Sequence, residues 1–353
     1  MKLVSVVGAR PQFVKLAPIA RACTDDNVDH VIIHTGQHYD PIMSDSFFDE
    51  LAIPRPNFHL DVGSAGHAKQ TADILAAIEP LLLREQPDWV LVYGDTNSTL
   101  AATVAAVKIH QRVAHLEAGL RSFNRAMPEE HNRVLTDHAS DLLLAPTGVA
   151  MGHLAEEGLA DRSALVGDVM ADVCLGIRDQ VQGLPNPLAE IVGDAPEFFV
   201  ATVHRAENTD SEDRLRQILT SFAQMPIPVV LLAHPRLPSR ATQFGLDLHA
   251  GSLVTTEPLA YPEMINSLLH SRGLITDSGG LQKEAYMLGV PCTTLRTETE
   301  WTETISDGWN ELAIDLTDTV AFAMRPPPST ARGLHFGDGS AAVRAVAAIR
   351  AAS

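Results

Sequence analysis

Short apolar runs alternate with helical patterns along almost the whole chain, and this alternation is the feature that most restricts its fold. Residues 89–93 and 198–202 are two such runs, and a polar turn follows each of them. Continuous apolar runs of this length are typical of strands buried on both faces of a parallel sheet. A Pro- and Gly-rich segment at 183–187 follows a first series of about six strands, and a second series comes after it. The sequence therefore predicts an α/β fold with two doubly wound, Rossmann-like domains that face a central cleft.

The length of the chain agrees with two domains. Its 353 residues are 45% apolar, which is enough for two hydrophobic cores. We place the N-terminal domain at residues 1–170 and the C-terminal domain at residues 171–338. Helices are also predicted at residues 42–51 and, as a final amphipathic helix, at 341–352.

Charge and cysteine content exclude several classes of protein. Lys and Arg total 26 against 44 for Asp and Glu, so a general nucleic-acid or anionic-membrane surface is disfavoured. Cys23, Cys174 and Cys292 are scattered, which argues against a disulfide framework or a structural zinc site. No apolar run approaches the length of a membrane span. We therefore expect a cytoplasmic protein that binds no metal, nucleic acid or membrane.

The turn Ser278-Gly279-Gly280 lies between an apolar run and a helical pattern. Unpaired backbone N–H groups and the positive end of a helix dipole would meet there, which makes the turn a candidate phosphate site. Glu284, about one turn into the helix, could accept hydrogen bonds from a ribose diol. The alternative is a tight turn in which Ser278 only caps the helix.

Cations follow the first strand of each predicted series. Arg10 and Lys15 lie at the start of the first helical pattern and suit a pyrophosphate, although simple surface charge explains them equally well. His204 and Arg205 follow the strand at 198–202 and could meet a diphosphate, whereas an ordinary loop histidine is the alternative for His204.

Three carboxylates occupy strand ends or helix starts of the first series: Asp95, Glu117 and Glu129. Each has an ordinary explanation, because Asp95 could cap a helix and Glu129 could complement a helix dipole. Ligands of open α/β sheets bind at the carboxyl ends of the strands, so three acids in such positions favour a shared functional cleft.

Seven motifs resemble those of the non-hydrolysing UDP-N-acetylglucosamine 2-epimerases, in the same order along the chain. They are Gly8-Ala9-Arg10-Pro11, His34-Thr35-Gly36-Gln37-His38-Tyr39, Gly94-Asp95-Thr96-Asn97-Ser98-Thr99, His115-Leu116-Glu117-Ala118-Gly119-Leu120-Arg121, Met127-Pro128-Glu129-Glu130-His131-Asn132-Arg133, Val203-His204-Arg205-Ala206-Glu207-Asn208 and Thr276-Asp277-Ser278-Gly279-Gly280. The resemblance implies a GT-B-like fold, a homodimer formed through the first domain, and a C-terminal helix, residues 339–353, that joins this domain.

The resemblance also implies an isomerase that inverts C2 of a UDP-sugar. Anti elimination of UDP gives a 2-acetamidoglucal, and UDP adds back after a proton reaches the opposite face, so no cofactor is required. By similarity, Asp95, Glu117 and Glu129 form the acid/base set, and His204 assists at the diphosphate. The residues that would bind the UDP-sugar substrate are Arg10, Lys15, Arg133, Arg205, Ser278, Gly279, Gly280, Glu284 and Met264.

The sequence leaves the sugar and the outcome open. Met264 occupies a position where the family often has Phe under the uracil ring, and Tyr39, Asp40 and Met43 replace glutamines of enzymes that their own substrate activates. The motifs Gly167-Asp168-Val169-Met170 and Thr299-Glu300-Trp301-Thr302-Glu303-Thr304 look closer to the branch that acts on UDP-2,3-diacetamido uronic acids. A hydrolysing epimerase that releases UDP and N-acetylmannosamine shares nearly every motif. A silent nucleotide-sugar-binding module is disfavoured, because a binder of an anion gains nothing from three nearby acids.

Overall fold

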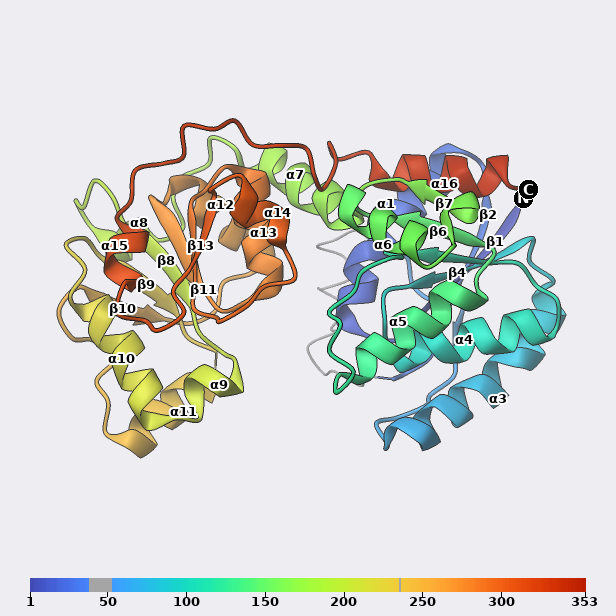
Figure 1. The fold of residues 1–353 in the computed structure, drawn as a ribbon, viewed down its shortest axis with the longest axis horizontal. Helices are drawn as coiled ribbons and strands as arrows, with labels where there is room; N and C mark the ends of the chain where they lie inside the picture. The colour runs from blue at the N-terminus through green and yellow to red at the C-terminus, as the bar shows by residue number, and fades with distance from the viewer. Residues whose placement is uncertain (38–52, 235) are drawn as a thin grey trace. The chain divides into compact units, whose positions relative to one another are not determined.

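The computed structural model describes residues 1–37, 53–234 and 236–353, and it divides the chain into two compact units (Figure 1). Unit 1 comprises residues 1–173 and 335–353, and unit 2 comprises residues 174–334. The predicted helix at 42–51 and the residues His38, Tyr39, Asp40 and Met43 lie outside the described residues. The division falls inside helix α7 (Val169–Val181), and the Pro- and Gly-rich segment 183–187 belongs to unit 2.

Unit 1 contains a seven-stranded parallel sheet. Its strands are β1 (Lys2–Val7), β2 (Asp29–His34), β3 (Phe58–His59), β4 (Trp89–Tyr93), β5 (Val113–Leu116), β6 (Leu142–Ala145) and β7 (Ser163–Leu165). They lie in the order β3-β2-β1-β4-β5-β6-β7, so the direction in which strands are added reverses between β1 and β4. All of the predicted strands are present. The prediction of about six strands did not include β3, which is only two residues long and not fully buried.

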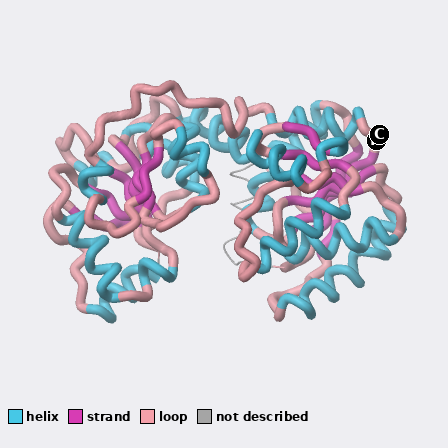
Figure 2. Tube along the Cα trace, in the orientation of Figure 1, coloured by secondary structure: helices cyan, strands magenta, loops and turns pink. Residues whose placement is uncertain are grey.

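Helices cover both faces of this sheet (Figures 1 and 2). They are α1 (Arg10–Asp25), α3 (His67–Glu85), α4 (Asn97–Lys108), α5 (Pro128–Ala139), α6 (Gly148–Glu156), the short 3-10 helix η1 (Ala160–Arg162) and α16 (Ala341–Ala351). Leu3 and Val7 of β1 pack with α1 and α16 on one face, whereas Val4 and Val6 pack with α3 and α4 on the other. Successive residues of a strand point to opposite faces, which explains why β1 is apolar throughout.

The C-terminal helix α16 packs against α1 in unit 1, and the two chain ends lie close together in Figure 1. Asp172 fixes the start of α16, because its carboxylate accepts hydrogen bonds from the backbone N–H groups of Ala341 and Ala342 at 2.9 and 2.7 Å. At the other end, the indole N–H of Trp89 donates to Ser353 at 3.0 Å. Helix α16 is therefore fastened at both of its ends to unit 1.

Unit 2 contains a second parallel sheet, of six strands. They are β8 (Phe199–Thr202), β9 (Val229–Leu232), β10 (Leu253–Thr256), β11 (Gly273–Thr276), β12 (Cys292–Thr294) and β13 (Asn310–Leu312). Its helices are α8 (Ala189–Val192), α9 (Ala206–Thr209), α10 (Glu212–Ala223), α11 (Arg236–Phe244), α12 (Tyr261–His270), α13 (Gly279–Leu288), α14 (Thr302–Ser306) and α15 (Thr319–Ala323). The strand order β10-β9-β8-β11-β12-β13 reverses between β8 and β11. Both units are thus doubly wound, and the fold is the predicted GT-B-like α/β class.

Candidate active site

Most of the predicted site residues lie at the point in each sheet where the strand order reverses. In unit 1, β1 leads to Arg10 and β4 leads to Asp95. In unit 2, β8 leads to His204 and Arg205, and β11 leads to Ser278. Ligands of open α/β sheets bind outside the carboxyl ends of the strands at these reversal points. The fold therefore brings together, within each unit, residues that are far apart in the sequence.

Lys15 and Glu117 form an ion pair in unit 1. Lys15 comes from α1, Glu117 follows β5, and both side chains are largely buried. Burial on its own would lower the pKa of Lys15, but the carboxylate of Glu117 outweighs it and the pKa lies above its ordinary value. Lys15 therefore remains protonated and holds the Glu117 carboxylate.

The backbone of Glu117 is in the left-handed region, with φ at +73°. This conformation is strained for a residue with a side chain, and the surrounding structure must hold it. The carbonyl oxygen of Leu144 accepts hydrogen bonds from the N–H groups of Glu117 and Ala118 at 3.1 and 3.2 Å. Gly94 lies beside the carboxylate: a Cβ atom there would be 3.2 Å from Oε2 of Glu117. A glycine at 94 thus leaves space for the Lys15–Glu117 pair.

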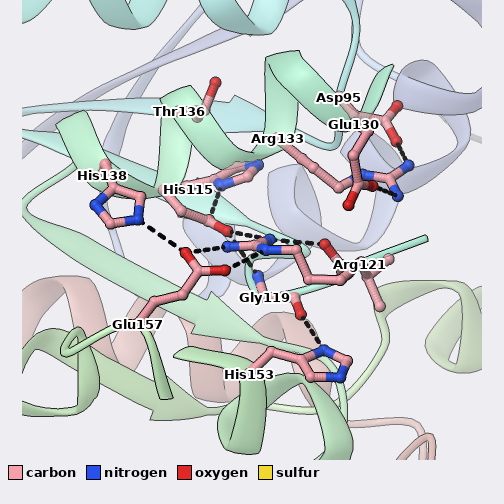
Figure 3. A network of polar contacts seen from close by, with 12 residues as sticks. Asp95, His115, Gly119, Arg121, Glu130, Arg133, Thr136, His138, His153 and Glu157 are labelled. Carbon is pink, nitrogen blue, oxygen red and sulfur yellow. Dashed lines mark hydrogen bonds and ion pairs between the residues drawn. The ribbon is translucent and has the colours of Figure 1, made fainter. Parts of the chain in front are cut away.

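Asp95 is held by α5. Its carboxylate pairs with the guanidinium of Arg133, and its backbone carbonyl accepts from the side-chain amide of Asn132 at 2.9 Å. Arg133 also contacts Glu130 at 3.0 Å (Figure 3). Arg133, predicted to bind substrate, therefore orients a predicted acid/base residue in this structure.

The two adjacent acids at the start of α5 have different surroundings. Glu130 is buried and accepts hydrogen bonds from the N–H groups of Ser122 and Phe123, each at 2.9 Å. Glu129 is exposed. Glu130 therefore fastens the preceding loop to α5, whereas the carboxylate of Glu129 is accessible to solvent.

Asp277 organises the corresponding turn of unit 2, and the sequence analysis assigned it no role. Its side chain is fully buried and accepts from the backbone N–H groups of His204 and Arg205 and from the side-chain amide of Asn208, at 2.9 to 3.2 Å. Nδ1 of His204 lies 3.0 Å from the carboxylate. Burial alone would raise the pKa of Asp277, but these hydrogen bonds outweigh burial and hold the pKa below its ordinary value.

The turn that follows β11 has the geometry expected of a helix N-terminus. Ser278 is the N-cap of α13, and a Cβ atom added at Gly280 would come no closer than 4.0 Å to any neighbouring atom. A Cβ atom at Gly279 would lie 2.8 Å from Oε1 of Glu300, so the segment after β12 packs closely against this glycine. The N-terminus of α13 thus presents backbone N–H groups beside an accessible Gly280.

The remaining predicted residues are dispersed around these turns. Glu284 is buried on α13 and accepts a hydrogen bond from the hydroxyl of Tyr261 at 3.0 Å. Met264 lies on α12 and packs partly against the core of unit 2. Nε of Arg205 donates to the carbonyl of Asp277 at 2.9 Å, and Arg10 is exposed at the first position of α1.

Within the described ranges, no group of three or more His, Cys, Asp or Glu residues could hold a metal ion. Among the helices in the same part of the chain, none is both long and apolar enough to cross a membrane.

Comparisons with known proteins point to one family. A family model described as UDP-N-acetylglucosamine 2-epimerase matches residues 21–350. The UDP-2,3-diacetamido-2,3-dideoxy-D-glucuronate 2-epimerase of Pseudomonas aeruginosa is 44% identical over 332 residues, which cover 92% of each chain. The UDP-N-acetylglucosamine 2-epimerase of Methanocaldococcus jannaschii is 41% identical over 326 residues, 89% of each chain. A crystal structure of the M. jannaschii enzyme in complex with UDP-GlcNAc and UDP is similar with a TM-score of 0.83 and 39% identity, and covers 99% of this chain and 100% of that one.

Replacing Asp277 tests its role in the turn. Asp277→Asn should lower the free energy of unfolding at pH 7 by about 1–3 kcal/mol, because buried N–H groups lose a charged acceptor. Since the folded pKa of Asp277 lies below that of the unfolded chain, about 3.9, its stabilisation is complete above that pH and is lost as the pH falls through the folded pKa. Urea unfolding should therefore show a difference from wild type that shrinks in acid. The exposed Asp194→Asn is the matched control, and an Asp277→Asn protein as stable as wild type at pH 7 would contradict this role.

Proposed function

The chain belongs to the UDP-N-acetylglucosamine 2-epimerase family of isomerases, and we propose that it inverts C2 of a UDP-2-acetamido sugar without hydrolysing it. The observation that carries this proposal is the arrangement of Asp95 and Glu117. Asp95 follows β4 and pairs with Arg133, and Glu117 follows β5 and pairs with Lys15. The two strands are parallel neighbours in the sheet. Moving a proton from one face of a carbon atom to the other requires two positioned acid/base groups. These two carboxylates lie near the point where the strand order reverses, which is where open α/β sheets bind ligands.

The chemistry explains why more than one acid is present. The hydrogen on C2 is only weakly acidic, so a positioned carboxylate must take it as a proton while the C1–O bond breaks and UDP leaves. The product of this elimination is a 2-acetamidoglucal. A second acid then delivers a proton to the opposite face of C2, and UDP re-forms the bond at C1. Asp95, Glu117 and Glu129 are the proposed acid/base set.

The proposed UDP-binding residues are centred on unit 2. The N-terminus of α13, with Ser278, Gly279 and Gly280, would hold the diphosphate through backbone N–H groups. Arg205 would add positive charge there and His204 a polar ring, and Asp277 fixes the backbone of both residues. Glu284 would bind the ribose and Met264 the uracil, as a soft apolar contact. Arg10, Lys15 and Arg133 are the proposed contributors from unit 1.

Two sugars are candidates for the substrate. We propose UDP-N-acetylglucosamine, on which the M. jannaschii relative acts by name. The second candidate is a UDP-2,3-diacetamido uronate, because the P. aeruginosa relative is 44% identical and carries that name. We further propose a cytoplasmic homodimer of the 38.0 kDa chain, which light scattering would test through its mass.

Incubating the protein with each UDP-sugar and following the anomeric signals by NMR tests the function. A non-hydrolysing epimerase should convert one of the two sugars to a mixture with its C2 epimer, with UDP still attached. Free N-acetylmannosamine with an equal amount of UDP would instead indicate the hydrolysing reaction, and no change in either sugar would refute the proposal.

Replacing either Asp95 or Glu117 should impair turnover without weakening the binding of UDP. Asp95→Asn and Glu117→Gln should lower turnover by ~10²–10⁴-fold, because each loses a group that transfers a proton. Affinity for UDP, measured by calorimetry, should be nearly unchanged, because the proposed diphosphate contacts belong to other residues. Asp161→Asn, an exposed acid of unit 1, is the control for the change in charge. Turnover near the wild-type rate in either variant would show that its acid is wrongly assigned.

A further inference from the structure

His115 is fully buried, and both of its ring nitrogens are hydrogen-bonded. Nδ1 lies 2.6 Å from Oδ1 of Asp137, and Nε2 lies 2.7 Å from the carbonyl oxygen of Gly94. Neither the family motifs nor the acid/base chemistry described above gives this histidine a role. A buried histidine with two short hydrogen bonds nevertheless restrains both of its partners, because breaking either bond would leave a buried polar group unpaired.

Both partners of this ring are hydrogen-bond acceptors. A carbonyl oxygen only accepts hydrogen bonds, and so does an ionised carboxylate. Burial alone would raise the pKa of Asp137, but His115 and Arg121 outweigh burial and hold it below its ordinary value. Asp137 is therefore ionised, and each ring nitrogen of His115 faces an oxygen that only accepts hydrogen bonds.

Asp137 belongs to a network of polar contacts that also includes His115, Gly119, Arg121 and Glu157, which are labelled in Figure 3. Its Oδ2 accepts from Nη1 of Arg121 at 2.7 Å and from the backbone N–H of Gly119 at 3.1 Å. Arg121 makes two further bonds to Glu157, at 2.7 and 2.9 Å, and Glu157 contacts His138 at 2.8 Å. The guanidinium of Arg121 lies between the carboxylates of Asp137 and Glu157, which makes a buried carboxylate at Asp137 tolerable.

The network joins the three segments that bear the proposed acids. Through His115, Asp137 holds the carbonyl of Gly94, the residue before Asp95. Directly, it holds the N–H of Gly119, two residues after Glu117. Asp137 itself lies on α5, which also carries Glu129 and Arg133, the partner of Asp95.

Backbone strain shows that these turns need to be held. Gly94, Glu117 and Gly119 all have positive φ, at +63°, +73° and +82°. A Cβ atom at Gly119 would lie 2.5 Å from the carbonyl oxygen of Ala150, so this turn is also pressed against α6. For Glu117, which has a side chain, the strained conformation persists only because several contacts determine it together.

We propose that His115 and Asp137 are positioning residues of the reaction, and that their buried hydrogen bonds set the relative placement of the Asp95 and Glu117 carboxylates. This inference rests on the proposed function, because it assigns the buried pair to the two acids of that mechanism. Displacing a reacting group by about 1 Å can cost ~10²-fold in rate. Loss of the pair should therefore impair turnover far more than binding.

Replacing His115 by Phe, which keeps a ring but removes both donors, is the direct test. His115→Phe should lower kcat by ~10²-fold while KM and the Kd of UDP stay within about threefold of wild type. His115→Gln can still donate to Gly94 and should recover part of the lost kcat. Asp137→Asn, which keeps the shape but loses the charge, should resemble His115→Phe.

Tyr93→Phe is the matched control. It also removes a buried hydrogen bond in unit 1, between the hydroxyls of Tyr93 and Ser5 at 2.8 Å, but that bond does not reach the acid-bearing turns. Its melting temperature should fall while kcat stays within about twofold. Unchanged kcat in both His115→Phe and Asp137→Asn, or an equal loss of kcat in Tyr93→Phe, would overturn the positioning role.

A crystal structure of His115→Phe or His115→Gln tests the inference without turnover. The expected result is that residue 117 leaves the left-handed region or that an acid separates from Lys15 or Arg133. Unchanged positions of both carboxylates would overturn the inference. Failure of the wild-type protein to invert any UDP-sugar would instead refute the proposed function, so the two failures are distinguishable.

Discussion

One buried, ionised aspartate stabilises the turn beside the reversal point in each sheet, Asp137 in unit 1 and Asp277 in unit 2. Burying a carboxylate is costly unless several donors surround it. In both units the donors include backbone N–H groups of the turns that carry proposed site residues: Gly119 in unit 1, and His204 and Arg205 in unit 2. The same hydrogen bonds that make these carboxylates tolerable therefore fix the geometry of the turns.

In unit 1, one of the turns held in this way contains the strained backbone of Glu117. A side chain at positive φ is unfavourable in isolation, and here it is accompanied by an ion pair with Lys15 and hydrogen bonds to the carbonyl of Leu144. The glycine at 94 leaves space for the Glu117 carboxylate, and the glycine at 119 lets the turn approach α6. Stability gained in the buried network thus offsets strain at a proposed acid/base residue, a relation that occurs often at functional sites.

Much of the fold could be predicted because buried parallel strands leave continuous apolar runs, as at Trp89–Tyr93. Strands β3 and β13 could not, because short, partly exposed strands leave no such run. The polar site was harder. Lys15, expected at a pyrophosphate, pairs with Glu117 in this structure, a contact that the sequence did not predict, and Asp277 supports His204 across 73 residues of sequence. Such contacts depend on tertiary distance, which residue types and spacing do not encode.

The proposed reaction requires one carboxylate to remove the C2 proton and another acid to deliver a proton to the opposite face. Turnover in deuterium oxide tests it most directly, because the acid that protonates C2 on the opposite face exchanges its own proton with solvent. NMR and mass spectrometry of the epimerised UDP-sugar should show one deuterium, located at C2. An inverted product that keeps its original hydrogen at C2 would contradict the account.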